Sequence, residues 1–188
     1  MVDTPEIQRS KGELRQRLRA LRASLSPAQK VAEEIQVGLE LAAYVVKEQP
    51  LSIASYAALP DELSIDAWHA QRWAAGHPVW LPRVVAAGLL SWHPVTDSTQ
   101  LATGAYGIRE PRPEVVPAQS LPPQAMLVVP GVAFTSDGWR LGQGGGFYDR
   151  LLATHQGPTL GLAFACQRVP EVPRGPHDCR VSEVIFGG

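Results

Sequence analysis

A glycine-rich segment near residue 140 carries the residue pattern with the clearest chemical meaning. Four glycines fall within five residues, at positions 142 and 144–146, with Arg140 before them and Asp149 after them. Glycines permit positive φ and bring no side chains, so successive backbone N–H groups can turn toward one anion. A helix that begins near Phe147 would add its positive end. The segment predicts a polyphosphate site, with Arg140 on phosphate and Asp149 on Mg²⁺ directly or through water.

This segment matches neither of the two common nucleotide-binding motifs. A Walker A loop requires Gly-Lys followed by Ser or Thr, and the chain contains no such sequence. A dinucleotide-binding fingerprint that starts at Gly142 would require glycine at position 147, which is Phe147. A flexible turn that only joins a strand to a helix is therefore an alternative. The charged residues at its two ends, Arg140 and Asp149, favour the phosphate site.

Short apolar runs alternate with helical patterns through the rest of the chain. Runs typical of buried strands are Leu51–Ala58, Val79–Leu81, Met126–Val129 and Thr159–Phe164, and Leu89–His93 is typical of an exposed edge strand. Helical spacing follows at 65–76 and at 147–155, whereas residues 94–124 predict a long excursion over the surface. This alternation predicts an α/β fold with a mainly parallel sheet covered on both faces. No repeat or long linker divides the chain, so residues 1–188 are predicted to form a single domain.

Two amphipathic helices are predicted over residues 10–48. Ser10 and Glu13 have the spacing of a capping box, and Ser26-Pro27 has the residue types that start a second helix. The expected buried residues are Leu14, Leu18, Leu21 and Leu25 in the first helix, and Val31, Ile35, Leu39, Ala42 and Val46 in the second. One face over from the first stripe runs a row of cations: Lys11, Arg15, Arg19 and Arg22.

Composition excludes several classes of protein. The 188 residues carry 17 Lys and Arg against 18 Asp and Glu, which gives a net charge of −1 and argues against general binding to nucleic acid or membranes. The two cysteines are far apart and fit a reducing compartment. No run approaches the roughly 20 apolar residues that span a bilayer, and the N-terminus lacks the apolar run of a signal peptide. A cytoplasmic protein is predicted, and a monomer, because no apolar stripe is left over.

Several ordered blocks resemble the 5-formyltetrahydrofolate cyclo-ligases, also called methenyltetrahydrofolate synthetases. The blocks are Lys11–Arg15 with Leu18, Arg19 and Arg22, then Asp61-Glu62, Leu81–Arg83, Tyr106–Pro111, Pro130–Phe134, Gly138–Arg150 and His177-Asp178. They extend from residue 11 to about residue 184. The resemblance implies a three-layer α/β domain similar to the ribose-phosphate isomerase-like and coenzyme A transferase-like folds.

The resemblance also implies an activity. The family converts 5-formyltetrahydrofolate and ATP into 5,10-methenyltetrahydrofolate, ADP and phosphate, with Mg²⁺. The formyl oxygen attacks the γ-phosphate, N10 attacks the activated formyl carbon, and phosphate leaves as the ring closes. Such chemistry needs aligned substrates and neutralised charge more than covalent help from the protein.

Site residues are implied by the same resemblance. Arg140, Lys11 and Arg15 are the expected catalytic residues, facing the ATP phosphates. The expected ATP-binding residues are these three together with Leu141, Gly142, Gln143, Gly144, Gly145, Gly146, Phe147 and Tyr148. Those expected to bind the folate are Glu62, Ala57, Tyr106, Gln143 and Phe147, and those expected to hold Mg²⁺ are Asp149 and Asp178.

The chain departs from the family pattern at three positions. Phe147 replaces a common tyrosine, Gln143 replaces a common tyrosine or arginine, and Ser182 stands where many relatives have a second acid. Glu183 is a candidate substitute for that acid. These departures concern substrate positioning more than the class of reaction.

Simpler interpretations exist for several of these residues. Arg19 and Arg22 could belong to a solvated helix face, Glu62 could cap a helix, and His177-Asp178 could be a surface turn. The alternative functions are a non-catalytic sensor of nucleotides or phosphosugars and an RNA-binding module that uses the cationic helix. Replacement of Asp149 by Asn separates the sensor from the enzyme, because activity should collapse while the melting temperature hardly moves.

Overall fold

A six-stranded sheet in the order β10-β9-β6-β1-β2-β3 occupies the middle of the computed structural model, which describes residues 3–104 and 107–188. The strands are β1 (Ile53–Ala54), β2 (Val79–Ala86), β3 (Leu89–Val95), β6 (Met126–Val129), β9 (Thr159–Ala163) and β10 (Glu183–Phe186). All neighbours pair in parallel except the edge strand β3, which runs antiparallel to β2. The prediction of a mainly parallel α/β sheet is confirmed.

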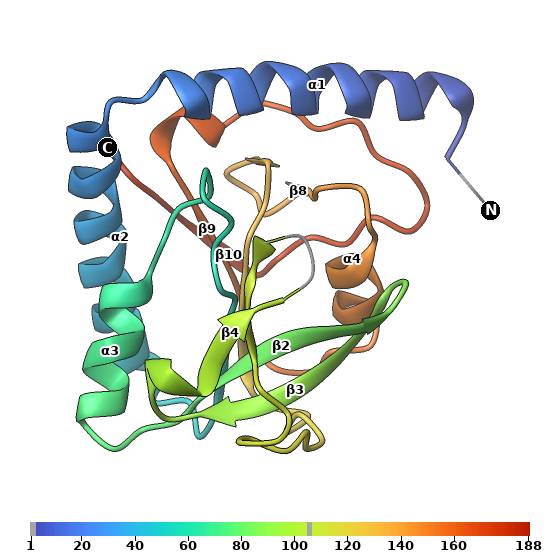
Figure 1. Cartoon of the computed structure of the whole chain (residues 1–188). Coiled ribbons are helices and arrows are strands. Elements are labelled where there is room, and N and C mark those ends of the chain that lie inside the picture. Colours follow the sequence, from blue (N-terminus) through green and yellow to red (C-terminus); the bar gives the residue numbers. More distant parts are fainter. Residues whose placement is uncertain (1–2, 105–106) are drawn as a thin grey trace.

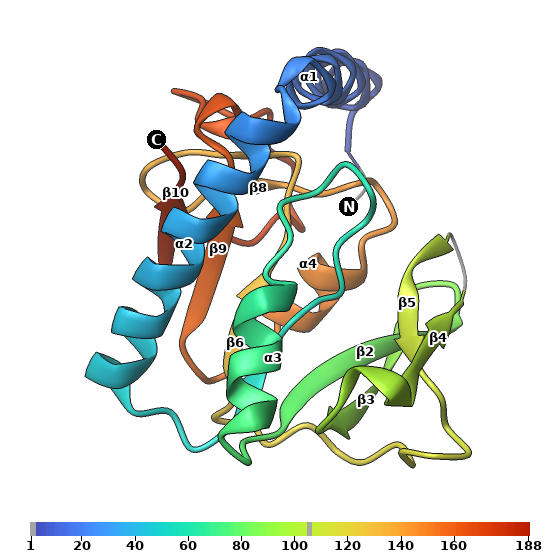
Figure 2. The same ribbon diagram turned by 60° about the vertical axis from the view of Figure 1, so that its left-hand side comes forward.

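Helices cover both faces of this sheet and one of its ends. They are α1 (Pro5–Ser24), α2 (Pro27–Glu48), α3 (Asp66–Ala74) and α4 (Phe147–Leu152). Helices α2 and α3 lie on one face and α4 on the other, while α1 crosses the end where the parallel strands finish (Figures 1 and 2). The cationic side chains of α1 therefore lie above the segments that leave the carboxyl ends of the strands, the usual place for a ligand in open α/β sheets.

Among the described residues, the chain also has two small strand pairs and two 3₁₀ turns. The pairs are β4 (Leu101–Thr103) with β5 (Arg109–Pro111), and β7 (Ala133–Phe134) with β8 (Arg140–Leu141); the turns are η1 (Ser98–Gln100) and η3 (Ala165–Gln167). Residues 94–124 are thus not wholly irregular, because they contain the β4–β5 hairpin. Strand β10 was not predicted, although it forms an outer edge of the sheet.

The first helix begins earlier than the sequence pattern indicated. Thr4 is its N-cap and accepts a hydrogen bond from the Ile7 N–H over 3.3 Å, and Pro5 occupies the first turn. Ser10 lies inside the helix, so the predicted start at residue 10 was wrong. Leu21 is 44% exposed, whereas the Arg22 side chain is buried at the end of the apolar stripe. The stripe was misread there because an arginine can be buried when it is paired.

The second helix begins at Ser26 as predicted, but it buries a different face. The Ser26 hydroxyl and the Gln29 side chain form a capping box. The residues that enter the core are Val37, Leu41 and Val45, while Val31, Ile35, Leu39 and Val46 are between 53% and 73% exposed. Apolar side chains lie on two faces of this helix, so spacing alone selected the wrong one. The premise of the monomer prediction, that no apolar stripe is left over, therefore fails, and the oligomeric state stays a prediction.

The ring of Phe134 packs tightly against Gly131 and against Gly161 of β9, beneath the glycine-rich loop. Phe134 is fully buried, and a Cβ atom on Gly161 of β9 would lie 2.5 Å from its ring. A Cβ atom on Gly131 would also lie 2.5 Å from the ring. Phe134 therefore packs beneath the loop and does not line the site. Any larger residue at position 161 would displace the base of the loop.

A buried histidine makes the stability of the fold depend on pH. His69 of α3 stacks on Trp73 and lies with Nε2 2.9 Å from Ser55 Oγ. Burial lowers its pKa from 6.5 to about 4. The unfolded chain therefore takes up a proton below pH 6.5 that the folded protein refuses until about pH 4, so stability falls as the pH drops through this window.

We expect the wild-type free energy of unfolding to fall by about 3 kcal/mol between pH 7 and pH 4 from this residue alone. The variant His69→Gln keeps a hydrogen-bonding side chain but cannot titrate, and should lose correspondingly less. Urea unfolding of both proteins at several pH values measures the difference. Equal losses in the two proteins would show that His69 does not cause the dependence.

Candidate active site

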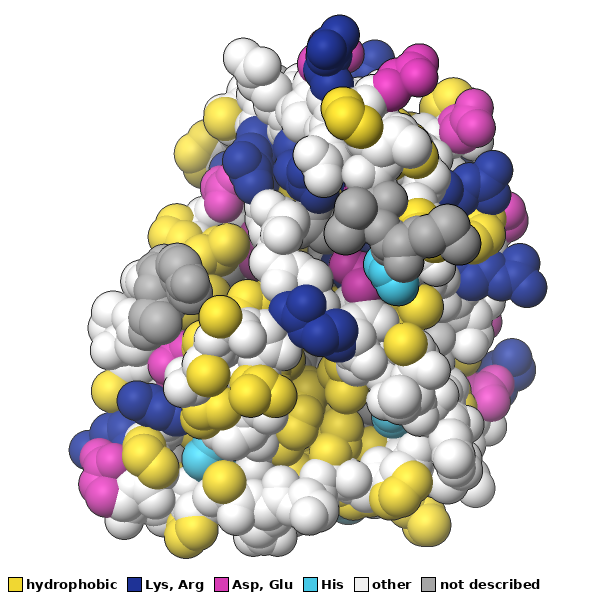
Figure 3. Space-filling model, turned by 90° about the vertical axis from the view of Figure 1, so that its right-hand side faces the viewer, with side chains coloured by type: hydrophobic (Ala, Val, Ile, Leu, Met, Phe, Trp, Pro, Cys, Tyr) yellow, Lys and Arg dark blue, Asp and Glu magenta, His cyan; other side chains and the backbone are white. Residues whose placement is uncertain are grey.

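A cavity of about 430 Å³ opens at the carboxyl ends of β1 and β6. Its apolar wall consists of Tyr56, Ala57, Leu59, Pro82, Val84, Leu90, Ile108, Pro130, Phe147 and Tyr148. The face that Figure 3 presents is hollowed, with apolar side chains gathered inside the hollow. Such a wall suits a flat, partly aromatic ligand, which a few polar groups would orient.

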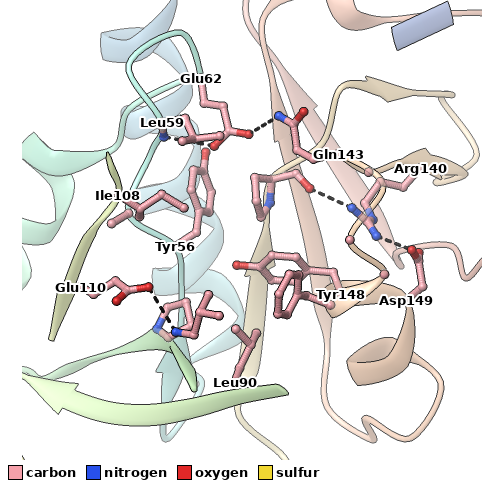
Figure 4. A pocket seen from close by; sticks show the side chains of 18 of the residues that line it. Tyr56, Leu59, Glu62, Leu90, Ile108, Glu110, Arg140, Gln143, Tyr148 and Asp149 are labelled. Carbon is pink, nitrogen blue, oxygen red and sulfur yellow. Dashed lines mark hydrogen bonds and ion pairs between the residues drawn. The ribbon is translucent and has the colours of Figure 1, made fainter. Parts of the chain in front are cut away.

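Polar side chains gather along one side of this cavity. Glu62 and Gln143 point toward one another at one end, while Arg140 and Asp149 form a pair at the other, and the Tyr148 ring lies below both pairs in the view of Figure 4. Glu110 lies on the opposite wall, where its Oε1 accepts a hydrogen bond from the Val84 N–H. The cavity therefore has two separate polar ends.

Arg140 is a buried cation with a donor to spare. Only 4% of the residue is exposed, and its Nη2 donates to Asp149 Oδ1 over 2.7 Å while Nη1 donates to the Pro130 carbonyl over 3.2 Å. Its Nε is buried and has no hydrogen-bond partner among the described residues. The guanidinium also lies 5.7 Å from the centre of the Tyr148 ring. A buried donor without a partner costs free energy, which an anionic ligand would recover.

The Glu62 carboxylate accepts two hydrogen bonds within the protein and can accept more. The residue is 8% exposed; Oε2 accepts from the Leu59 N–H over 3.1 Å, and Oε1 accepts from Gln143 Nε2 over 2.7 Å. A carboxylate has about four acceptor sites, so one remains on each oxygen. Two parallel N–H donors of a ligand fit these sites. Glu62 is therefore more than a helix cap, since Ile65 caps α3 without a side-chain hydrogen bond.

The glycine-rich loop is tied to α1 by two arginines. Arg15 Nε donates to the Gly142 carbonyl over 2.8 Å, and Arg19 Nη2 donates to Gln143 Oε1 over 2.6 Å. Burial lowers the pKa of Arg15, and the neighbouring Arg19 adds to this effect. Gly144 and Gly146 have φ of +107° and +66°, and residues that carry a side chain adopt such values only with strain.

The helix after the loop is shorter than predicted. Helix α4 has six residues and ends at Leu152, not at residue 155. Such a short helix contributes little dipole, so the positive charge around the loop comes from the guanidinium groups.

Lys11 lies beside the site in a network of ion pairs. Its Nζ is 2.6 Å from Asp178 Oδ2 and 2.7 Å from Asp3 Oδ2, and the Gly175 N–H also donates to Asp178. Burial lowers the pKa of Lys11, but its hydrogen bonds to the two carboxylates outweigh burial and raise it overall. Lys11 and Asp178 do not line the cavity, so the predicted contact of Lys11 with a ligand would require this network to open.

Each of the two predicted metal ligands is paired with a cation, Asp149 with Arg140 and Asp178 with Lys11. Asp149 and Asp178 both act electrostatically on Arg15 and on the Cys179 thiol, whose pKa is raised by burial and then by Asp149. Within residues 3–104 and 107–188, no group of three or more His, Cys, Asp or Glu forms a metal-binding cluster. Mg²⁺ is commonly held by one or two carboxylates together with substrate phosphates, so two acids fit this chemistry.

The predicted substitute for a missing acid is wrong. Ser182 hydrogen-bonds to Thr159 at the start of β9, and Glu183 lies beside Tyr44 of α2, where it helps burial to raise the pKa of that phenol. Neither residue lines the cavity. Glu183 therefore cannot replace a carboxylate near Asp178, because it lies against α2.

The structure brings most of the predicted site residues to one cavity. Those that line it are Ala57, Glu62, Arg140, Gly142, Gln143, Gly145, Gly146, Phe147, Tyr148 and Asp149. Those that do not are Lys11, Arg15, Leu141, Gly144 and Asp178, of which Leu141 is buried in β8 beneath the loop. Tyr106 lies outside the described residues.

Sequence reasoning missed much of the apolar wall and one buried acid. Pro82, Leu90, Ile108 and Glu110 come from β2, β3 and the β4–β5 hairpin, which lie far from the glycines in the sequence. Two of the blocks that resemble the family, Leu81–Arg83 and Tyr106–Pro111, contain or adjoin these residues and could have indicated them. Arg19, for which a solvated face was an alternative, also lines the cavity.

The fold is a mainly parallel α/β sheet, and its cavity lies at the carboxyl ends of the strands beside a glycine-rich loop that arginines surround. A family model described as the 5-formyltetrahydrofolate cyclo-ligase family matches residues 7–187. The chain belongs to this family of ligases.

Individual relatives agree with this assignment. The chain is 30% identical to the 5-formyltetrahydrofolate cyclo-ligase of Haemophilus influenzae, with 93% of this chain and 96% of the relative covered. It is 32% identical to the enzyme of that name from Escherichia coli K12, over 89% of this chain and 95% of the relative. The NMR structure of the Aquifex aeolicus 5,10-methenyltetrahydrofolate synthetase superposes with a TM-score of 0.79 at 28% identity, covering 94% of this chain and 89% of that one.

Proposed function

We propose that this protein uses ATP to convert 5-formyltetrahydrofolate to 5,10-methenyltetrahydrofolate, with release of ADP and phosphate. The single observation that carries the proposal is the cavity with two polar ends, an unsaturated carboxylate at Glu62 and a buried guanidinium with a spare donor at Arg140. Family membership and the names of the relatives support it.

The carboxylate end suits the pterin ring of the folate. A pterin carries a ring N–H and an exocyclic amine side by side, which match the two free acceptor sites on Glu62. Ala57, Phe147 and Gln143 lie along the same cavity and would contact the ring system. Tyr106 is proposed as a further contact on the strength of the sequence alone.

The guanidinium end suits the phosphates of ATP. Arg140, Arg15 and Lys11 are proposed to neutralise them, and the segment from Leu141 to Tyr148 is proposed to bind the nucleotide. The reaction then requires the formyl oxygen to attack the γ-phosphate in line. N10 attacks the activated formyl carbon, loses its proton, and inorganic phosphate departs as the ring closes. Each step spreads negative charge over phosphate oxygens, which fixed cations stabilise best in a site that excludes water.

Asp149 and Asp178 are proposed to hold Mg²⁺ together with the phosphates. When bound, the ion neutralises phosphate charge and orients the transferred group. The two carboxylates would first have to exchange their present partners, Arg140 and Lys11, for the ion. Those cations would then be free to contact the phosphates.

The decisive experiment follows the near-ultraviolet absorption of the methenyl product. Purified protein is mixed with 5-formyltetrahydrofolate and Mg-ATP, and controls omit ATP or Mg²⁺. A rise that needs both additions supports the proposal. A flat trace from folded protein that binds ATP would overturn it and would favour the non-catalytic nucleotide or phosphosugar sensor.

A cytoplasmic monomer with no nucleic-acid or membrane partner is the accompanying proposal. Among the described residues, no helix is long and apolar enough to cross a membrane.

Replacement of Glu62 by Gln tests the folate end. Gln presents an amide N–H₂ where one pterin donor must be accepted, so two charge-assisted hydrogen bonds are lost or weakened. We expect KM for 5-formyltetrahydrofolate to rise about 100-fold, with KM for ATP changed less than about threefold. Steady-state kinetics with each substrate varied measures both. Glu13→Gln, on an exposed part of α1, is the matched control, and an unchanged folate KM in Glu62→Gln would contradict the role of Glu62.

A further inference from the structure

A chain of hydrogen bonds joins helix α1 to the Glu62 carboxylate through Gln143. Arg19 Nη2 donates to Gln143 Oε1 over 2.6 Å, and Gln143 Nε2 donates to Glu62 Oε1 over 2.7 Å. The two ends fix the orientation of the amide, because a reversed amide would set its oxygen against the carboxylate and its N–H₂ against the guanidinium. Figure 4 shows the amide of Gln143 directed at Glu62 across the top of the cavity.

Gln143 belongs to the same loop that is proposed to bind the nucleotide. Its neighbour Gly142 accepts a hydrogen bond from Arg15 over 2.8 Å, and Gly144 on its other side has a φ of +107°. A ligand bound to this loop therefore also acts on the Gln143 amide. The amide in turn holds one oxygen of Glu62, while the Leu59 N–H holds the other.

We propose that Gln143 is a positioning residue that couples the two ends of the cavity, so that nucleotide and folate each raise the affinity for the other. The inference rests on the proposed function, because it takes the two ligands from it. Coupling through one shared group is reciprocal, so both ligands gain by the same factor. The Gln143 contact does not block the folate, since Glu62 keeps one acceptor site on each oxygen.

Chemistry at both ends requires a neutral amide at position 143. A Leu at this position would make neither hydrogen bond. A Glu would keep the contact with Arg19 but would repel Glu62, so it breaks the link at one end only. The two variants thus distinguish the two hydrogen bonds: Gln143→Leu loses both, whereas Gln143→Glu keeps the bond to Arg19 and loses only the bond to Glu62.

Equilibrium binding tests the inference without turnover. The Kd of 5-formyltetrahydrofolate is measured alone and with a saturating non-hydrolysable ATP analogue plus Mg²⁺, and the reverse titration gives the Kd of the analogue. We expect each ligand to tighten the other about tenfold in the wild-type protein. The factor should fall to about one in Gln143→Leu and in Gln143→Glu. Gln16→Leu, on the exposed side of α1, should keep the wild-type factor.

Three outcomes contradict the inference. A wild-type factor retained in Gln143→Leu, or in Gln143→Glu if the Leu variant fails to fold, shows that the coupling does not pass through Gln143. Binding of both ligands to the wild-type protein without coupling overturns the inference alone. Absence of folate binding to the wild-type protein overturns the proposed function, and the inference falls with it.

Discussion

Replacement of Asp149 by Asn should reduce kcat by about a thousandfold while the protein remains folded. The carboxylate is proposed to bind Mg²⁺ with the phosphates, and an amide is a much weaker ligand for this hard cation. The hydrogen bond from Arg140 Nη2, now 2.7 Å from Asp149 Oδ1, can be made to the Asn oxygen as well. We therefore expect the melting temperature to move by no more than about 4 °C.

Product formation at a series of Mg²⁺ concentrations measures the effect, and thermal unfolding checks the fold. Asp137→Asn serves as a control, because Asp137 is an exposed acid that contacts Thr135 and does not line the cavity. Wild-type turnover in Asp149→Asn would exclude Asp149 as a metal ligand. Loss of activity with full nucleotide binding would separate catalysis from the sensor alternative.

The core strands and the glycine-rich loop were predictable because residues that are neighbours in the sequence determine both. Met126–Val129 is apolar at every position and becomes a strand that is buried on both faces. The loop brings its own phosphate-binding residue types, and Arg140, Gln143 and Asp149 indeed line one cavity with Glu62. Local patterns of this kind depend little on the rest of the chain.

Features that depend on pairing between distant residues were not predictable. Arg22 is 1% exposed only because Asp61 lies 2.7 Å away, and no local pattern shows that partner. Strand β10 contains one exposed residue and becomes a strand by pairing in parallel with β9. The exposed face of α2 was misassigned for the same reason, since the core selects Val37 and Leu41 over an equally apolar stripe.

The site shows the same division. Residue types near the glycines indicated an anion site and include the local pair of Arg140 with Asp149, whereas the ion pair that occupies Asp178 joins α1 to the C-terminal segment. Lys11 pairs with Asp178, which lies 167 positions further along the chain. Long-range electrostatics of this kind decide which groups must separate before phosphate and metal can bind.

Replacement of Arg140 by Lys should lower kcat/KM by roughly 300-fold, although the charge is kept. The guanidinium uses two nitrogens to hold Asp149 and the Pro130 carbonyl, and a third, Nε, has no partner in the part of the chain that the structure describes. A lysine has one nitrogen on a flexible stem, so it cannot hold Asp149 and the phosphates in fixed geometry at once. The loss should fall mainly on kcat, because the missing contact is made to charge that develops in the transition state.

Kinetics for Arg140→Lys and Arg17→Lys, measured together with ATP-induced shifts in melting temperature, distinguish this role from a structural one. Arg17 is an exposed arginine of α1 that does not line the cavity, so its replacement should leave kcat/KM unchanged. A folded Arg140→Lys protein that still gains stability from ATP but turns over slowly supports phosphate stabilisation in the transition state. Full activity in this variant would mean that charge alone suffices, and the fork geometry of Arg140 would then serve only to hold Asp149 and the loop.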